Sequence, residues 1–531
     1  MKKYGSYFLV MLVMTALFSG CFENPAGSKN SKPSFTERQK DVSADYGDTL
    51  TLSVAADGEP DPTFSWKKDG ETIDGEDDSE LVIKGVRLTD AGTYVVRVKN
   101  SEGSVYDTVK VKVSGGEPVA SVGDAVDPVR LGDTVKLTVS VAGDRPFEYQ
   151  WFRNDEAIDD ADDSILTLAS VTKEDLAEYT VAVTNDGGAD TSDVMKVELL
   201  PAKVFVGETD FQTGLLERIN TVSNEVTGDG IAVYSDATVK QYSGYVYILE
   251  RMGADNVIKY NPEEDGSDAV MYQVHLGDNW NPQDIEFVND TKAYIANMNE
   301  PKITVFNPEE GSVVENIDIS AYTVNPDSNT SPYAKAMALS EGKLYVLLQR
   351  RDGFNPAKTS LILTVDTESD EVMEDDTISC SFKNGYDIIA VDGALYVTNP
   401  GSSMASDDGA IEKIDLESGE VSTVITEEDL GGSPNQIVHK EGTRFYVQNY
   451  VGWTDVEVVE IDVEDGEVIE VLDDVTDAFG GIAYDNDGER LYVGERDASE
   501  VGVKVFKDNE LIGSAIKSSG SLPPSCITFI R

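Results

Sequence analysis

The chain has 531 residues, and 99 acidic against 42 basic side chains give it a formal net charge of −57 at neutral pH. A surface this negative repels phosphate backbones and anionic lipid headgroups, so we expect neither nucleic-acid binding nor peripheral adsorption to membranes. Only two histidines are present, which excludes a histidine-rich metal site. Apart from Cys21 only Cys380 and Cys526 are present, and they share no turn, so we expect two buried thiols instead of a disulfide framework.

The acidic residues are spread over short turns, such as those at 75–80, 159–164 and 262–268, and are not gathered in one tail. This distribution indicates a solvated surface that resists aggregation. Weak calcium binding by some of these turns is the alternative. The sequence DVEDGEV at 462–468 lacks the alternating ligands and the distal glutamate of an EF-hand loop.

The N-terminus has the pattern of an export signal. Lys2 and Lys3 precede a mostly apolar stretch from Tyr7 to Phe18, and Ser19-Gly20-Cys21 follows. This pattern resembles a bacterial lipobox, which implies that residues 1–20 are cleaved and that Cys21 carries lipid; a plain signal peptide with an incidental cysteine is the alternative. Residues 21–33 then form a flexible tether. Phe22 stands where an inner-membrane retention signal has Asp, so we expect the outer membrane, on its periplasmic or its external face.

Two copies of one β-sandwich pattern follow, at 34–114 and 117–200, with alternating strands and closely spaced turns. The copies resemble the immunoglobulin superfamily, close to its I-set, through one tryptophan and one tyrosine in each: Trp66, Trp151, Tyr94 and Tyr179. The bridging cysteines of that family are replaced by valines: Val54, Val96, Val139 and Val181. We expect a stalk packed around the tryptophans, and adhesion through exposed edges is the alternative.

The last 330 residues repeat one short strand phrase seven times, and its aromatic residue recurs every 42 to 51 residues. The seven aromatics are Phe205, Tyr247, Tyr294, Tyr345, Tyr396, Tyr446 and Tyr492. This period predicts a seven-bladed β-propeller over 202–531 in an all-β chain. The first phrase has no strand before it, and the chain ends on a strand with no phrase after it, CITFIR at 526–531. We therefore expect this last strand to be innermost in the first blade.

The stretch Tyr396-Val397-Thr398-Asn399 is that of the YVTN-type repeat, and the region resembles YncE-like and surface-layer-associated propellers. Residues 205–229 also look like the first blade of propeller lipoproteins on diderm surfaces, some of which capture cobalamin. The resemblance implies a ligand-binding role, with cobalamin as one candidate.

Two groups of residues are expected at one mouth of the propeller. The first lies three places after each aromatic and is polar in six of seven copies: Glu208, Glu250, Asn297, Asn399, Asn449 and Glu495. These side chains either line the mouth or cap their own turns, and capping is favoured. The second group is large or cationic: Trp280, Tyr333, Tyr386, Trp453, Phe354, Phe479, Tyr450, Arg251, Arg350, Arg351 and Arg496. It suits a planar or sugar-like ligand, and packing between blades is the alternative.

The sequence offers little for catalysis. Asp284 and Asp387 each precede the isoleucine of an innermost strand, which allows them to face the channel, but two carboxylates that lie two blades apart make a poor acid–base pair. Central binding of calcium or water by them is the alternative. We therefore expect a non-catalytic protein without metal or cofactor. Its partner would be a small molecule such as cobalamin, a glycan, or a protein of the cell envelope. The alternatives are an adhesin or surface-layer component and, third, a polysaccharide lyase or hydrolase.

Overall fold

The computed structural model describes residues 29–123, 125–221, 223, 225–325, 331–353, 355–402, 408–452, 454–517 and 522–530. The expected signal segment, Cys21, Phe354 and Trp453 lie outside these ranges. Contacts divide the chain into two units, one formed mainly by residues up to Val197 and one mainly by residues from Glu198 onward. Among the described residues, no helix has the length and apolar character needed to span a bilayer.

The first unit contains two sets of strands. The first set comprises β1 (Ser31–Glu37), β2 (Val42–Asp45), β3 (Thr49–Ser53), β4 (Ala55–Glu59), β5 (Thr63–Lys68), β6 (Glu71–Thr72), β7 (Glu80–Lys84), β8 (Gly92–Asn100) and β9 (Gly103–Ser114). These strands form sheets in the orders β2-β9-β8-β5-β6, β3-β7 and β1-β4. Their alternating apolar side chains meet in one core around Trp66.

The second set of strands repeats this arrangement. It comprises β10 (Val119–Val122), β11 (Val135–Ala142), β12 (Glu148–Arg153), β13 (Glu156–Ala157), β14 (Ile165–Leu168), β15 (Glu178–Asn185), β16 (Gly188–Thr191) and β17 (Met195–Lys196). The sheets have the orders β10-β11-β14 and β13-β12-β15-β16, with β17 paired to β15.

Both expected core motifs are present. The indoles of Trp66 and Trp151 are fully buried, and each donates its N–H to a backbone carbonyl. The hydroxyl of Tyr94 donates to the carbonyl of Asp90 at 2.9 Å, and Tyr179 makes the same bond four residues back. The four valines that replace the family's cysteines are buried beside these rings: Val54, Val96, Val139 and Val181. Apolar packing thus occupies the space that a disulfide fills in many such domains.

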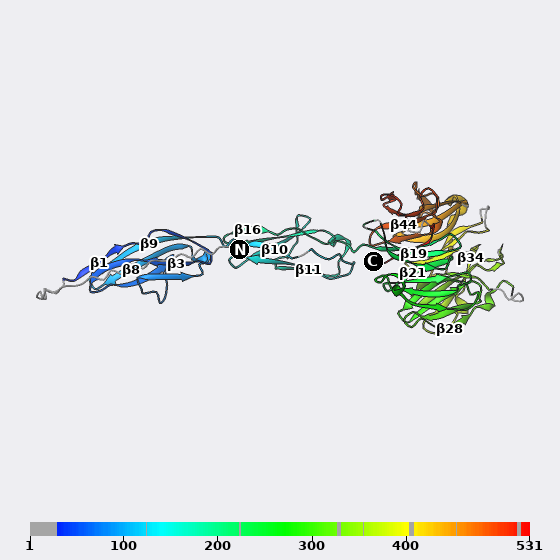
Figure 1. Cartoon of the computed structure of the whole chain (residues 1–531), viewed down its shortest axis with the longest axis horizontal. Coiled ribbons are helices and arrows are strands. Elements are labelled where there is room, and N and C mark those ends of the chain that lie inside the picture. The colour runs from blue at the N-terminus through cyan, green and yellow to red at the C-terminus, as the bar shows by residue number, and fades with distance from the viewer. Residues whose placement is uncertain are drawn as a thin grey trace. The chain divides into compact units, whose positions relative to one another are not determined.

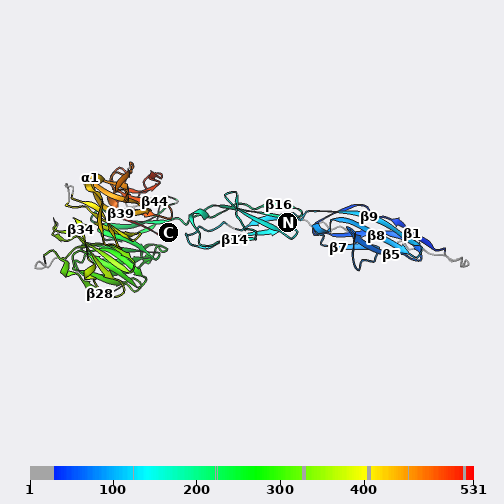
Figure 2. The same cartoon turned by 180° about the vertical axis from the view of Figure 1, so that it is seen from behind.

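The described part of the second unit contains seven four-stranded antiparallel sheets. The first sheet combines the C-terminal strand β47 (Pro524–Ile530) with β18 (Lys203–Thr209), β19 (Gly214–Asn220) and β20 (Glu225–Val233). The next three sheets are β21 (Ala237–Tyr242), β22 (Tyr245–Glu250), β23 (Asn256–Tyr260) and β24 (Val270–His275); β25 (Pro282–Asn289), β26 (Lys292–Asn297), β27 (Lys302–Asn307) and β28 (Ser312–Asp318); and β29 (Ala334–Ser340), β30 (Lys343–Leu348), β33 (Thr359–Asp366) and β34 (Ile378–Lys383). The last three sheets are β35 (Asp387–Val391), β36 (Ala394–Asn399), β37 (Ala410–Asp415) and β38 (Val421–Thr426); β39 (Ser433–Glu441), β40 (Arg444–Gly452), β41 (Asp455–Asp462) and β42 (Glu467–Val471); and β43 (Ile482–Asp485), β44 (Arg490–Glu495), β45 (Gly502–Lys507) and β46 (Glu510–Leu511). Figures 1 and 2 show these sheets, coloured from green to red, within one compact body.

The first strand of each sheet, here called the inner strand, contacts the inner strands of the two neighbouring sheets. The inner strands are β21, β25, β29, β35, β39, β43 and β47, and β47 contacts both β43 and β21, so the series closes on itself. The C-terminal strand β47 pairs antiparallel with β18, which lies at the start of the unit. The expectation that the last strand completes the first sheet is therefore confirmed.

The repeated aromatic residue packs between neighbouring sheets. Tyr247 is almost completely buried, and its ring centroid lies 4.5 Å from that of Phe287 in the following sheet. Tyr396 and Phe445 make the same kind of contact at 4.7 Å. Apolar clusters accordingly span two sheets, which explains why the second strand of each sheet is apolar on both faces.

A second repeat lies at the turn between the third and fourth strands. The side chains of Asp366, Asp415 and Asp462 each accept backbone N–H bonds from the residues two and three places later. These bonds close an Asx turn and stabilise the ionised carboxylate. For Asp415 the N–H of Ser418 contributes most to holding the pKa below its usual value.

We expect Asp415→Ala to lower the melting temperature of the second unit at pH 7. Because the folded-state pKa is depressed, this carboxylate stabilises the fold above its unfolded pKa of about 3.9, and the contribution is lost as the pH falls through the folded value. The difference from the unmodified chain should therefore shrink on going from pH 7 to pH 3. Calorimetry at both pH values measures it, with exposed Asp375→Ala as the matched control. An equal deficit at both pH values would contradict the assignment.

Candidate functional site

The inner strands surround a cavity of about 680 Å³. At one level of this cavity each inner strand has one residue in an equivalent register position, just before an apolar position that is Ile in five of seven strands. These seven residues are Thr238, Asp284, Ala336, Asp387, Gln436, Gly481 and Cys526. They all contribute to the cavity wall.

Three residues of this level tie neighbouring inner strands together. Asp284 accepts the backbone N–H of Met337 at 2.8 Å, Asp387 accepts that of Ile437 at 3.1 Å, and Gln436 accepts that of Ile482 at 2.9 Å. In each case the donor N–H belongs to the residue that directly follows this level on the next inner strand. Asp284 and Asp387 thus line the cavity, and both hold its wall together.

A compact charged group lies beside them. The ammonium of Lys240 is 3.2 Å from a carboxylate oxygen of Asp284 and also contacts Glu286. Burial opposes the charge on Lys240, but the two carboxylates raise its pKa above the usual value. Burial raises the pKa of Glu286 to about 7 and that of Asp387 to about 6. These carboxylates are bonded to the Lys240 ammonium and to backbone N–H groups.

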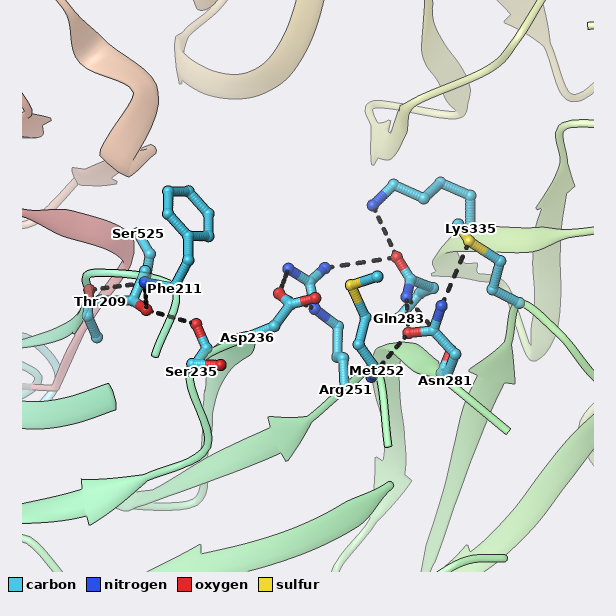
Figure 3. A network of polar contacts seen from close by, with 12 residues as sticks. Thr209, Phe211, Ser235, Asp236, Arg251, Met252, Asn281, Gln283, Lys335 and Ser525 are labelled. Atoms are coloured by element: carbon cyan, nitrogen blue, oxygen red, sulfur yellow. Dashed lines mark hydrogen bonds and ion pairs between the residues drawn. The ribbon is translucent and has the colours of Figure 1, made fainter. Parts of the chain in front are cut away.

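Four residues nearer the strand starts form what we call the mouth cluster: Arg251, Gln283, Lys335 and Tyr386. Arg251 Nη1 and Lys335 Nζ both donate to Gln283 Oε1, at 3.4 and 3.1 Å. Figure 3 shows the two cations reaching this one oxygen from different sides, with Asp236 beside Arg251. The Lys335 ammonium also lies 4.6 Å from the centre of the Tyr386 ring. Burial, and then the charge of Arg251, lower the pKa of Lys335 to about 8.

A second cation–aromatic pair involves the cavity wall. The guanidinium carbon of Arg496 lies 3.8 Å from the centre of the Phe479 ring, and Phe479 lines the cavity. Arg496 is held by Asp477, whose carboxylate accepts its Nε at 3.0 Å. Tyr450 meets Phe479 edge-on, with a centroid distance of 6.2 Å.

Of the large and cationic residues expected at the mouth, the structure brings Arg251, Tyr386 and Phe479 into the cavity wall. Trp280 instead packs against an apolar cluster, and Lys302 covers its ring at 3.8 Å. Tyr333, Arg350 and Arg351 lie beside β29 and β30, outside the cavity wall, and burial lowers the pKa of both arginines. Tyr450 and Arg496 contact Phe479 without lining the cavity themselves, so the structure brings together only part of the expected set around this cavity.

The six polar residues three places after the aromatics are also not an open rim. Glu208, Glu250, Asn297, Asn399, Asn449 and Glu495 are all buried, with at most 5% of each exposed. Glu250 accepts the backbone N–H of Tyr234, Glu495 accepts those of Thr476 and Asp477, and Asn297 donates to the carbonyl of Lys302. These bonds fit the capping alternative. The physical reason is that the second strand is covered on both sides, so its last residue turns inward.

The sequence reading missed Lys240, Glu286, Gln283, Lys335 and Gln436. An alignment of the inner strands would have shown the first four of them one place before or two places after the Asp284 level, and Gln436 at that level. Within the described ranges, no group of three His, Cys, Asp or Glu side chains is arranged to hold a metal ion.

Comparison with known proteins identifies the domains of the first unit. Residues 33–113 match the model of the immunoglobulin I-set domain, and residues 117–185 match that of an immunoglobulin domain. Two immunoglobulin domains are therefore present, as the tryptophans and tyrosines predicted.

Known proteins that are similar to part of this chain include one named for immunoglobulin-like domains and one named as a cell adhesion molecule. The chain is 28% identical over 209 residues to human leucine-rich repeats and immunoglobulin-like domains protein 1, covering 36% of this chain and 19% of that protein. It is 28% identical over 217 residues to neural cell adhesion molecule 1 of Gallus gallus, covering 36% and 20%. The chain thus matches about a fifth of the length of these relatives. Among solved structures, the four N-terminal immunoglobulin domains of Dscam1 isoform 9.44 match with a TM-score of 0.25 and 22% identity, covering 33% of this chain and 47% of that one.

Proposed function

We propose that residues 202–531 form a seven-bladed β-propeller of the YVTN and YncE-like kind. Three observations support this proposal: the seven four-stranded sheets, the closed series of contacts between inner strands, and the shared sheet of β47 and β18. The YVTN phrase itself lies on β36, with its tyrosine packed against the next sheet.

We further propose that this propeller is a non-catalytic receptor for a small molecule, such as a glycan or cobalamin, bound at the mouth of the channel. The observation that carries the proposal is the cavity of about 680 Å³, with Tyr386 and Phe479 in its wall and hydrogen-bonding amides beside them. Aromatic faces combined with a few polar groups are typical of small-molecule sites. The carboxylates of the cavity have structural partners, which favours binding over catalysis.

The proposed location of this receptor and its attachment to the membrane rest on the sequence. The lipobox resemblance supports an exported chain anchored to the outer membrane through Cys21, with the immunoglobulin domains as a stalk. The formal charge of −57 supports contact with a membrane through the anchor alone.

Retention of a ligand in native mass spectrometry tests the receptor proposal. The secreted chain is exposed to cobalamin, to a glycan panel and to envelope extract. We expect one retained small molecule, and we expect Tyr386→Ala with Phe479→Ala to weaken its binding at least tenfold, because each stacked ring contributes about 1 kcal/mol. Tyr106→Ala, an exposed tyrosine of the first immunoglobulin domain, is the matched control. Unchanged retention by the double variant would refute the site.

Adhesion is the second candidate function, and one observation favours it. A relative of the immunoglobulin domains is named as a cell adhesion molecule. The domains also expose large apolar side chains, including Tyr106 and Val119, which are 57% and 59% exposed. Beads coated with the first unit alone should then aggregate, and Tyr106→Ser should reduce the aggregation.

A further inference from the structure

The mouth cluster contains two cations that share one neutral acceptor. Arg251 and Lys335 both lie within 3.4 Å of Gln283 Oε1. Arg251 also has Asp236 as an ion-pair partner, whereas among the described residues no carboxylate lies within 4 Å of the Lys335 ammonium. Like charges that meet in a partly buried site repel one another, and an amide oxygen compensates them only in part. The cluster is therefore short of negative charge at the point where its two donors converge.

The acceptor is held in position from behind. Gln283 Nε2 donates to Asn281 Oδ1 at 2.9 Å, which turns its Oε1 toward the two cations. Asn281 is fixed in turn because its backbone N–H donates to Asp255 Oδ1 at 2.8 Å, and Asp255 is fully buried. The donors therefore converge on a preset point instead of following a mobile side chain, and this preorganisation lowers the cost of binding.

Other charges facing Lys335 limit what can bind there. Asp284 projects from β25 and Asp387 from β35, and both act on Lys335 at longer range together with Asp236 and Arg251. Lys240 is shared between Asp284 and the neighbouring Glu286, and Asp387 accepts the N–H groups of Ile388 and Ile437. A ligand with one negative charge is matched by the remaining positive charge of the cluster, whereas a phosphate with nearly two charges leaves one facing these carboxylates.

We propose that the mouth cluster binds the carboxylate group of a small molecule, and that a planar or sugar ring of the same molecule lies against Tyr386. The two carboxylate oxygens accept N–H donors of Arg251 and Lys335 that Gln283 Oε1 does not use, and the two bonds to Gln283 keep these donors in position. This inference rests on the proposed receptor function and assigns its ligand class. Charge-assisted bonds of this kind are about twice as strong as neutral ones, so the carboxylate fixes the orientation of the ligand.

Calorimetric titration of the whole chain with matched probes tests the inference. Benzoate and glucuronate are compared with benzamide and glucose, and inorganic phosphate is the rival oxyanion. We expect each carboxylate to bind at least tenfold more tightly than its neutral counterpart and more tightly than phosphate. Lys335→Gln and Arg251→Gln should remove this preference. Lys413→Gln is the matched control, because Lys413 also lies over a tyrosine ring, that of Tyr396, but away from the cavity.

The pH dependence gives an independent measurement. Because the pKa of Lys335 is lowered to about 8, its charge is lost over a range in which Arg251 stays protonated. Binding of benzoate should weaken at least tenfold between pH 7 and pH 9, and Lys335→Gln should remove most of that dependence, leaving the smaller part that comes from ionisation of Glu286, whose pKa is about 7. A pH-independent affinity in the unmodified chain would overturn the assignment of Lys335.

The outcomes separate this inference from the receptor proposal. Equal binding of carboxylates and their neutral counterparts, tighter binding of phosphate, or no binding of any probe overturns the carboxylate assignment. If a neutral glycan or cobalamin is nevertheless retained and its retention depends on Tyr386, the receptor proposal stands without it. If the double variant Tyr386→Ala with Phe479→Ala changes neither measurement, both fail.

Discussion

A chain that lacks residues 524–531 should lose the cooperative unfolding transition of its second unit. Strand β47 pairs along its length with β18, and its Ile527 and Ile530 are buried in clusters that include the neighbouring sheets. Its removal exposes the inner edge of β18 and opens the wall of the cavity between β43 and β21. Because the two strands lie more than 300 residues apart in the chain, no local segment can replace the lost pairing.

Differential scanning calorimetry measures this effect. The immunoglobulin transition should persist, while the second transition broadens or disappears. A synthetic peptide of residues 522–531 added in excess should restore the transition, because it supplies the missing strand. A truncated chain that melts as cooperatively as the full one, at the same temperature, would show that β47 is dispensable.

The sequence predicted the architecture well because the aromatic residue of each phrase has one physical role throughout. Each packs between sheets, so the same residue type is required at each repeat and the period is visible. The pairing of the last strand could be predicted because the first phrase has no strand before it and the strand at 526–531 has no phrase after it. In the immunoglobulin domains, Trp66 and Trp151 likewise occupy positions with a single structural solution.

The candidate site could be predicted only in part, because its residues have no common identity from sheet to sheet. Lys335 and Gln283 stand one place before the level of Asp284, and a bulge between Pro282 and Asp284 shifts the register there. The sequence shows the residue but not the bulge. Asn297 and Glu495 differ from these residues, because a polar residue at the end of a strand can line a mouth or cap its own turn, and their burial and bonds agree with the capping that the sequence favoured.

Glu495 and Lys504 form a buried ion pair in the last sheet. The carboxylate of Glu495 is fully buried and lies 3.3 Å from the ammonium of Lys504, which is only 2% exposed. Lys504 also donates to the carbonyl of Asp474 and pairs with Glu500. Burial opposes the charge on Lys504, but bonds to Glu500 and Glu495 hold its pKa above the usual value. The sheet of β44 and β45 therefore contains a desolvated ion pair in place of an apolar contact.

We expect Lys504→Met to lower the free energy of unfolding of the second unit by about 3–5 kcal/mol, because it leaves the Glu495 carboxylate buried without its cation. Urea denaturation followed by tryptophan fluorescence and circular dichroism measures the loss. Lys507→Met is the matched control, since Lys507 lies on the same strand, is exposed, and meets Glu489 only at 3.9 Å. That control should change stability by less than about 1 kcal/mol.

The double variant Lys504→Met with Glu495→Gln distinguishes a lost charge partner from a lost contact. Removing both charges should recover part of the stability, because a neutral amide can still accept the backbone N–H bonds of Thr476 and Asp477. If the two single changes instead add in the double variant, the ammonium does not compensate the carboxylate, and Glu495 is stabilised by those N–H groups alone. Glu495 would then act only as a cap for its own loop, which is the alternative that the sequence favoured.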